Sequence, residues 1–404
     1  MLNKAIEVEN ELKDKFKEID QVVYINSEKV LSAFHKELVQ ASDFNGTTGY
    51  GYGDIGRDKL ERIYADIFHC ERALVRAQFV SGTHALTVGF FGILRPGDTL
   101  LSITGLPYDT LHKVIGIVPN ESSLISFGIN YKYIDLVDND FDYDKISKSL
   151  ENVRVIHIQR SIGYSDRETL SIEKIEKVIR FIKEINKEII VFVDNCYCEF
   201  CTELEPTDVG ADLVIGSLIK NLGAGIANNG AYIVGKERLV ELCAERLTSP
   251  GLGSEVGSSL SQNRNFYEGL YLSPRVVGNA LKVKLFTSLL CKKLGFNVIN
   301  ENTNDIVLGI VFNNENKLIN YVKAIQEASA IDAHFSPVPS DMPGYDSQII
   351  MASGSFTDGS SIELSCDAPI REPFIAYQQG SLTYEYGKMG VIKALEKVCE
   401  DFNE

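Results

Sequence analysis

The chain has 404 residues, enough to bury a large core in two closely packed domains. Its hydrophobic content of 44% and charged content of 24% are ordinary for a soluble globular protein. The formal net charge of −16 disfavours nucleic acids and anionic membranes as partners, because neither polyanion is attracted to a negative surface. A local basic pocket for a small anion is still compatible with this charge.

Neither a targeting segment nor a disulfide framework is indicated. The first forty residues carry charges throughout, and no later stretch has the roughly 20 apolar residues that cross a membrane. The eight cysteines suit a reducing compartment, so we expect a cytoplasmic protein. Cys196, Cys198 and Cys201 lie close in sequence but lack a second ligand pair at zinc spacing, so we expect no metal site.

The first part of the chain predicts an α/β domain. Residues 1 to about 40 predict a polar amphipathic helical arm. A helix follows over 60–68, and the stretch VSGTHALTVGFFGIL enters another, which stops at the turn signal RPGD. TLLSI, VRVIHIQ, EIIVFVDN and ADLVIGS are short, almost unbroken apolar runs, typical of strands buried on both faces of a parallel sheet.

An amphipathic helix lies between two of these strands, with isoleucines at three- and four-residue spacing over 172–185 behind a Ser171 cap. Alternation of such helices with buried strands predicts a mostly parallel sheet under helices. After Pro274 we expect a smaller α+β domain. Its predicted elements are a helix over 276–294, strands in DIVLGIVF and SIELS, a helix near 317–327, and a helix after Gly387. The predicted divisions are an arm (1–45), a large domain (46–275) and a small domain (276–404).

Polar residues follow the predicted parallel strands, at the ends where open sheets bind ligands. They are Gln159 with Ser161, then Asp194, then Ser217 with Lys220. A carboxylate at the rim of an apolar sheet needs a cationic or protonated partner. For Asp194 alone, however, capping the following loop is the simpler explanation.

Lys220, in GSLIKNLGAG, admits three interpretations. Ser217-x-x-Lys220 spells the S-x-x-K of serine acyl-transferases, but the companions S-D-N and K-T-G are absent. A nucleotide loop needs G-x-x-x-x-G-K-[ST], also absent, and no G-x-G-x-x-G follows an early strand. The third interpretation, a solvated lysine after a buried strand, is the commonest for any lysine.

Partners elsewhere in the chain favour a pyridoxal phosphate site. Such a site needs a lysine for a Schiff base, an acid for the pyridine nitrogen, amides for the phosphate and an aromatic ring over the cofactor. Lys220 and Asp194 follow successive strands and supply the first two. Gly82 and Thr83, in VSGTHAL, place amides at a helix N-terminus, where the dipole favours an anion.

Two further side chains complete this set. Ser217 lies three residues before Lys220 and can add a hydroxyl to the phosphate site. Tyr108, in GLPYDT, lies beyond the next strand, where it can stack on the cofactor ring. The sequence therefore supplies each of the four parts that this chemistry requires.

These motifs together resemble a known family. SGTHA, a tyrosine about two dozen residues later, VDN and SxxK resemble the fold-type I pyridoxal phosphate enzymes, in the cystathionine and methionine γ-lyase branch. More narrowly, TTGYGYGDIGRDKLERIYADIF, LVRAQFVSGTHAL, SIELSCDAPIREP and QQGSLTYEYGK resemble the bacterial aluminium resistance proteins, often labelled methionine γ-lyase family. The resemblance runs from about residue 20 to the end. Each motif is weak alone, but several in one order at fitting intervals are specific.

The resemblance implies pyridoxal 5′-phosphate as the cofactor, with Lys220 as its Schiff-base lysine and Asp194 as the partner of its ring nitrogen. Lys220 must lose a proton to act as a nucleophile, which burial favours. Lys220, Asp194 and Tyr108 form the implied catalytic set. The implied cofactor-binding residues are Tyr52, Gly82, Thr83, Tyr108, Ser161, Asp194, Ser217 and Lys220.

Two further assignments concern a partner subunit and the substrate. Tyr52 matches a tyrosine that in the lyases reaches the phosphate of a neighbouring subunit's cofactor, which implies a homodimer or homotetramer with shared active sites. The lyases place an arginine two residues later, where this chain has Asp54, and Arg57 is the candidate substitute. Arg371, in DAPIREP, is the candidate for holding a substrate carboxylate through two parallel N–H bonds. Pairing with surface acids is the alternative role for this arginine.

The resemblance implies a carbon–sulfur lyase that eliminates at the β or γ carbon of a sulfur-containing amino acid such as cystathionine or methionine. Its products would be a thiol, ammonia and a 2-oxo acid. Two alternatives stay open: a non-catalytic pyridoxal phosphate protein in regulation or aluminium tolerance, and a pyridoxal phosphate enzyme of another reaction type, such as an aminotransferase. Turnover of amino acids by the purified protein discriminates among them.

Overall fold

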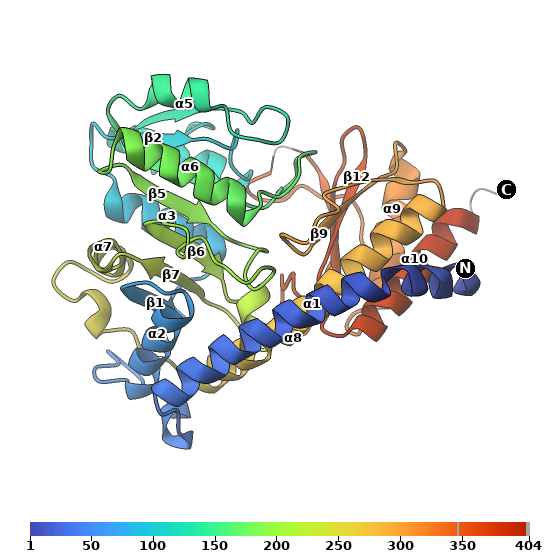
Figure 1. The fold of residues 1–404 in the computed structure, drawn as a ribbon, viewed down its shortest axis with the longest axis horizontal. Helices are drawn as coiled ribbons and strands as arrows, with labels where there is room; N and C mark the ends of the chain where they lie inside the picture. Colours follow the sequence, from blue (N-terminus) through green and yellow to red (C-terminus); the bar gives the residue numbers. More distant parts are fainter. Residues whose placement is uncertain (346, 401–404) are drawn as a thin grey trace.

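A seven-stranded sheet organises the larger lobe of the computed structural model, which describes residues 1–345 and 347–400 (Figure 1). Its order is β1-β7-β6-β5-β4-β2-β3. Strand β7 runs antiparallel to both neighbours, whereas the pairs from β6 to β3 are all parallel. The predicted α/β fold is therefore confirmed. The strands are β1 (Arg72–Arg76), β2 (Thr99–Ser102), β3 (Asn130–Tyr133), β4 (Val153–Gln159), β5 (Ile190–Asp194), β6 (Leu213–Ser217) and β7 (Ala231–Gly235).

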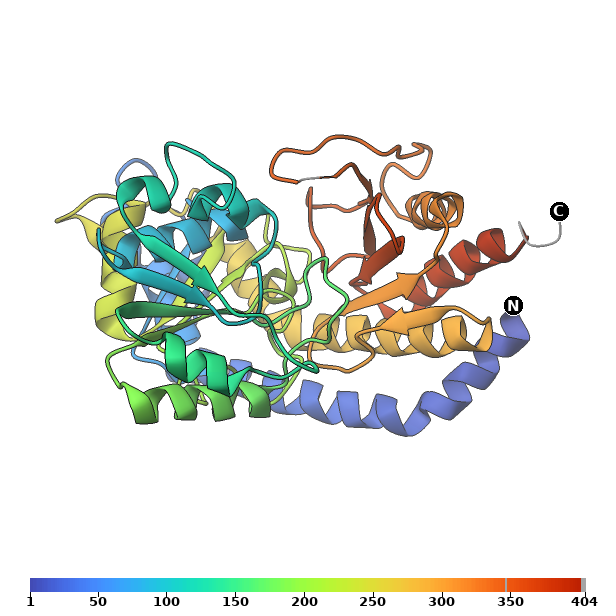
Figure 2. The same cartoon turned by 90° about the horizontal axis from the view of Figure 1, so that it is seen from above.

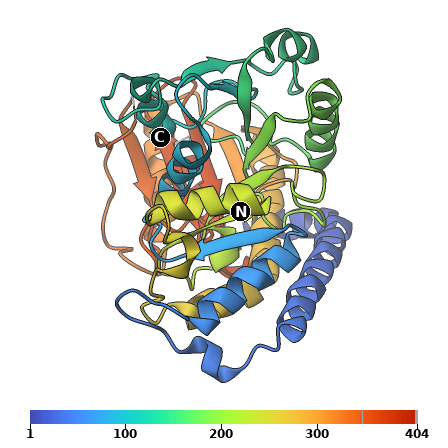
Figure 3. The same ribbon diagram turned by 90° about the vertical axis from the view of Figure 1, so that its left-hand side faces the viewer.

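Helices cover both faces of this sheet, as its unbroken apolar strands require. In β5, Val191 and Val193 join one hydrophobic core with α2 and α6, whereas Phe192 joins the core on the opposite face with α3 and α7. Figure 3 shows α2 and α7 on opposite sides of the sheet at its β1 edge. The helices are α2 (Ile55–Ile67), α3 (Gly82–Ile93), α4 (Thr110–Ile115), α5 (Tyr143–Ser149), α6 (Ile172–Ile185) and α7 (Glu237–Leu247), with short 3₁₀ turns at Ala41–Phe44, Ile125–Phe127, Asn221–Gly223 and Gly253–Glu255.

Serine caps begin two of these helices. The Ser171 hydroxyl accepts a hydrogen bond from the backbone N–H of Lys174, as predicted for α6. The Ser81 hydroxyl accepts from the N–H of His84 and begins α3. Because these caps act within one helical turn, a local pattern suffices to identify them.

The smaller lobe contains an antiparallel sheet in the order β10-β11-β12-β9-β8. Its strands are β8 (Asn297–Ile299), β9 (Val307–Val311), β10 (Ile349–Ala352), β11 (Ser365–Pro369) and β12 (Ile375–Gln379), and its helices are α9 (Glu315–Glu327) and α10 (Tyr384–Glu400). The predicted strand SIELS is wrong, because β11 begins only at its last residue. The Glu363 carboxylate accepts hydrogen bonds from the N–H groups of Phe356 and Thr357, and thereby holds this stretch as a loop.

Helix α8 (Asn263–Lys293) begins earlier than predicted and contains Pro274. A proline in a helix has no N–H for the carbonyl four residues before it, here that of Leu270. The Ser273 hydroxyl donates to this carbonyl at 3.0 Å and replaces the lost hydrogen bond. The helix therefore continues through the residue chosen as the predicted boundary between the large and small domains.

Helix α1 (Leu2–Lys36) lies alongside α8 and spans both lobes (Figure 2). Its early apolar residues, Ala5, Val8 and Leu12, belong to the core of the small lobe. Its later ones, such as Ile19 and Val23, belong to a core of the large lobe. The predicted helical arm is thus a long helix with one buried stripe that contacts both lobes. None of the described helices is long and apolar enough to cross a membrane.

A buried ion pair lies where the two lobes meet. Lys284 Nζ, on α8, is 2.7 Å from Asp305 Oδ1, and both side chains are almost fully buried. Asp305 also accepts hydrogen bonds from the side chains of Asn300 and Thr169. Thr169 precedes α6 of the large lobe, so this carboxylate links the two lobes.

Replacing the lysine of this pair should destabilise the protein strongly. In Lys284→Met, Asp305 stays buried without its cation, and we expect the free energy of unfolding to fall by about 3–5 kcal/mol, as measured by chemical denaturation. Lys15→Met is the control, because Lys15 and its partner Glu18 are exposed and should contribute little. Equal stability of the two variants would contradict this interpretation of the lobe junction.

Candidate active site

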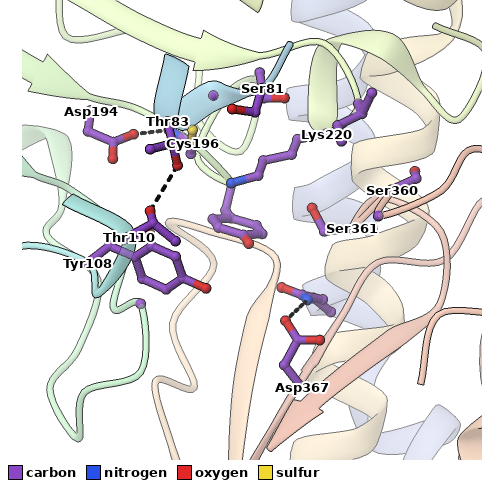
Figure 4. A pocket seen from close by; sticks show the side chains of 18 of the residues that line it. Ser81, Thr83, Tyr108, Thr110, Asp194, Cys196, Lys220, Ser360, Ser361 and Asp367 are labelled. Carbon is purple, nitrogen blue, oxygen red and sulfur yellow. Dashed lines mark hydrogen bonds between the residues drawn. The ribbon is translucent and has the colours of Figure 1, made fainter. Parts of the chain in front are cut away.

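A cavity of about 270 Å³ lies between the lobes, at the carboxyl ends of the parallel strands (Figure 4). The large lobe contributes the ends of β4, β5 and β6 together with the beginning of α3, and the small lobe contributes β11 and the segments that flank it. The cavity brings together seven of the predicted site residues: Gly82, Thr83, Tyr108, Ser161, Asp194, Ser217 and Lys220.

Asp194 and Lys220 line this cavity from adjacent strands. Asp194 is the last residue of β5, and its Oδ1 accepts a hydrogen bond of 3.1 Å from the Cys196 N–H. Lys220 follows β6, and its Nζ lies 3.8 Å from the centre of the Tyr197 ring. An acid and an amine are thus presented to one cavity, and the loop that follows β5 contacts both of them, through Cys196 and Tyr197.

The protonation of Lys220 is set by two opposing effects. Burial lowers the pKa of Lys220, as expected from the sequence, because a buried ammonium loses its hydration. Negative charge on neighbouring groups, including Cys196, Tyr197 and Asp194, raises this pKa by more, and the net shift is upward. Burial thus acts in the expected direction, but in the protein without a ligand the neighbouring groups outweigh it.

The part of the cavity at the beginning of α3 can bind an anion. Gly82 and Thr83 begin α3, so their amides lie at a helix N-terminus. The buried hydroxyl of Ser217 has no hydrogen-bond partner in the described structure. A Cβ at Gly82 would lie 3.3 Å from the Ser217 Cβ, so glycine keeps the space between them open. A free buried hydroxyl beside free helix amides suits a ligand with several acceptor oxygens, such as a phosphate.

Tyr108 forms the wall of the cavity beyond β2. Its backbone N–H donates to Gln159 Oε1 at 2.7 Å, which ties the loop to the end of β4. Its hydroxyl lies 2.8 Å from that of Tyr345, and burial raises its pKa well above the usual range, so the phenol keeps its proton at neutral pH. Ser161 also lines the cavity, and its carbonyl accepts from the Gln159 side chain.

The small lobe contributes residues that the sequence analysis did not identify, among them Tyr345, Ser360, Ser361, Asp367 and Gln379. Asp367 had a detectable signal, because polar and apolar residues alternate in the stretch SCDAP. Ser365 and Asp367 line the cavity, whereas Cys366 and Ala368 lie in the small-lobe core. A strand in which polar and apolar residues alternate has one polar face, but the local sequence does not show which part of the protein that face contacts.

The chain is similar to proteins of one known family. The family model for methionine gamma-lyase matches residues 1–399. The chain belongs to the methionine gamma-lyase family. The uncharacterized protein YnbB of Bacillus subtilis is 47% identical over 403 residues, which cover 98% of this chain and 96% of that protein.

Solved structures agree with membership of the methionine gamma-lyase family. A protein of Listeria monocytogenes, provisionally named a cystathionine beta-lyase involved in aluminum resistance, is 46% identical with a TM-score of 0.96, over 98% of this chain and all of that one (100%). The pyridoxal-5′-phosphate-dependent protein YhfS of Escherichia coli is 16% identical with a TM-score of 0.64, over 95% and 97% of the two chains. The second likeness shows a shared fold, that of a pyridoxal phosphate-dependent protein.

Tyr52 does not line the cavity. Its side chain is 60% exposed, and Tyr50 and Ile55 beside it are also exposed. Asp54, which replaces the arginine of the lyases, is buried and caps α2 by accepting from the Arg57 N–H. Arg57 donates to the carbonyls of Gly51 and Gly257, so its guanidinium holds two loops together. The roles predicted for Tyr52 and Arg57 toward a partner's phosphate stay predictions.

Arg371 also lies outside the cavity. It is exposed, donates to the carbonyl of Tyr164 at 3.1 Å, and lines a separate hollow with Asp166 and Tyr377. Its predicted contact with a substrate carboxylate stays a prediction.

Proposed function

We propose that the protein is a pyridoxal 5′-phosphate-dependent carbon–sulfur lyase, which eliminates a thiol from the β or γ carbon of an amino acid. The observation that carries this proposal is the arrangement of one cavity. Lys220 and Asp194 line it from adjacent strand ends, and the unpartnered Ser217 hydroxyl lies beside the α3 amides. Membership of the methionine gamma-lyase family supports the reaction type.

The residues present fit this cofactor. The amides of Gly82 and Thr83, with the Ser217 hydroxyl, would hold its phosphate. The Asp194 carboxylate would keep a proton on its ring nitrogen, and Tyr108 would cover the ring. Lys220 would bind it covalently through Nζ. Each of these groups lines the cavity, so the cofactor would use the free hydroxyl and amides that the protein leaves there.

When bound, pyridoxal 5′-phosphate supplies an electron sink for the negative charge that develops at the α carbon of an amino acid. Lys220 is the only lysine or arginine among the described residues that line the cavity, and it would serve as the base. The substrate's amino group would first displace Lys220 from the cofactor, and the freed, neutral Nζ would then take the α proton. The C–S bond would break with its electron pair on sulfur, and the sulfur would leave as a thiol after taking up a proton. The neutral phenol of Tyr108 can donate a hydrogen bond to the departing sulfur.

Loss of the lysine should abolish both cofactor attachment and turnover. With added pyridoxal 5′-phosphate, the natural protein should show the visible absorption of a lysine-bound cofactor, and Lys220→Ala should lack it. Turnover should fall at least about 100-fold, since a positioned base contributes that much or more. Lys236→Ala is the matched control, because Lys236 is half-exposed, pairs with Asp212 and does not line the cavity. Unchanged absorption in Lys220→Ala would remove Lys220 from the site.

A substrate screen tests the reaction type. Cystathionine, methionine and cysteine are supplied singly, and free thiol and 2-oxo acid are measured separately. We expect thiol and 2-oxo acid in equal amounts from at least one of them, without an added amino acceptor. Formation of 2-oxo acid only with an added acceptor would instead indicate an aminotransferase. Cofactor binding with no turnover of any amino acid would favour the non-catalytic alternative.

We propose also that two subunits share each site, because no arginine and no second lysine faces the cavity among the described residues that line it. The exposed Tyr52 is the residue we assign to the partner's phosphate. Sedimentation should give a dimer or tetramer, and Tyr52→Ala should weaken cofactor binding roughly tenfold, as expected for one lost hydrogen bond to a charged group. An active monomer would contradict this assignment.

A further inference from the structure

Asp367, on β11, presents a carboxyl group to the cavity from the small lobe, while Lys220 lines it from the large lobe (Figure 4). Its Oδ2 accepts two hydrogen bonds of 3.1 Å, one from the Tyr164 hydroxyl and one from Gln379 Nε2. Its Oδ1 has no hydrogen bond within the described part of the chain. One oxygen is thus fixed by two neutral donors and the other is left for a ligand.

The charges around the cavity do not balance. Two carboxyl groups, Asp194 and Asp367, line it, and Lys220 is their one basic partner among the described lining residues. Asp194 has a role toward a cofactor ring, and Lys220 would be bonded to that cofactor. Asp367 would then be left without a cation. A half-buried carboxylate in that position is costly unless a ligand supplies positive charge.

The surroundings of Asp367 suit an ammonium group. Burial raises its pKa, and its two donors together with Lys220 lower it by less, so a further cation would offset the cost of ionising it. The rings of Tyr108 and Tyr345 lie 5.2 and 5.9 Å from that of Tyr164, and aromatic faces attract cations. Lys220 already places its ammonium over the Tyr197 ring in this cavity.

We propose that Asp367 binds a cationic amino group carried on the sulfur substituent of the substrate, so that the site selects thioether amino acids with an amino group on the departing half. This inference rests on the proposed lyase function. An uncharged substituent leaves the Asp367 carboxylate without a counter-charge, and an anionic one is repelled by it. Tyr164 and Gln379 act as positioning residues, because they orient the carboxyl group.

A matched pair of substrates tests the proposal. S-(2-aminoethyl)-L-cysteine and S-propyl-L-cysteine have departing groups of equal length, and they differ by the charge at the end. Both release pyruvate on β-elimination, so one assay serves for both. We expect kcat/KM to be about 10- to 100-fold higher for the aminoethyl compound, the range for a hydrogen bond to a charged group, with most of the difference in KM. The corresponding homocysteine thioethers serve in the same way for γ-elimination, with their common oxo acid as the product measured.

Two variants identify the residue responsible. Asp367→Asn should bring the ratio of the two kcat/KM values close to one, whereas a general loss of folding lowers both values alike. Asp166→Asn is the control, since Asp166 is exposed in the neighbouring hollow and its loss removes the same charge. It should keep the ratio of the natural protein.

Four results would overturn the proposal. Equal kcat/KM for the two compounds in the natural protein would do so without any variant. A preference that survives in Asp367→Asn, or that is lost equally in Asp166→Asn, would exclude a direct contact with Asp367. If the cofactor-loaded protein turns over an amino acid of the substrate screen but neither of these pairs, the assignment of Asp367 fails alone; if it turns over none of them, the proposed lyase function fails as well.

Discussion

Parallel pairing of β4, β5 and β6 is the constraint on which the site depends. Within this pairing, Gln159 lies opposite Asp194, and Asp194 lies opposite Ile215, two residues before Ser217. Neighbouring strands lie about 4.8 Å apart, so residues far apart in sequence meet at one edge of the sheet. A shift of one residue in β5 would turn Asp194 toward the other face of the sheet. The apolar strand interiors therefore hold the polar ends in place, because each strand is packed against helices on both faces.

The side of the cavity that the small lobe contributes depends on how the two lobes are held together. Helices α1 and α8 run side by side across both lobes, and α1 contributes apolar residues to a core in each. The carboxylate of Asp305 adds polar links to Lys284 and Thr169 at the junction. These contacts set the position of β11, and hence of Asp367, relative to Lys220. The proposed substrate specificity thus rests on packing between lobes, whereas the proposed cofactor chemistry rests on the large lobe.

The sequence predicts those features that arise within one strand or one helical turn. The buried parallel strands and the Ser171 cap were identified for this reason. The predicted start of α8 is wrong because a proline such as Pro274 usually interrupts a helix. The hydrogen bond from the Ser273 hydroxyl, which lets the helix continue, cannot be recognised from the positions of prolines and glycines alone. The loop before β11 depends on Glu363 and the distant backbone groups that it binds. The alternation of polar and apolar residues predicts a polar face on the strand that carries Asp367. Only the packing of the two lobes shows that this face lines the cavity.

Covalent binding of pyridoxal 5′-phosphate to Lys220 is the proposal from which the chemistry of this cavity follows. The most direct test is to load the purified protein with the cofactor, reduce it with borohydride so that the bond becomes permanent, digest it, and locate the pyridoxyl group by mass spectrometry. We expect one modified peptide, with the added mass on Lys220. Modification spread over exposed lysines, or a single modified lysine elsewhere, would contradict it.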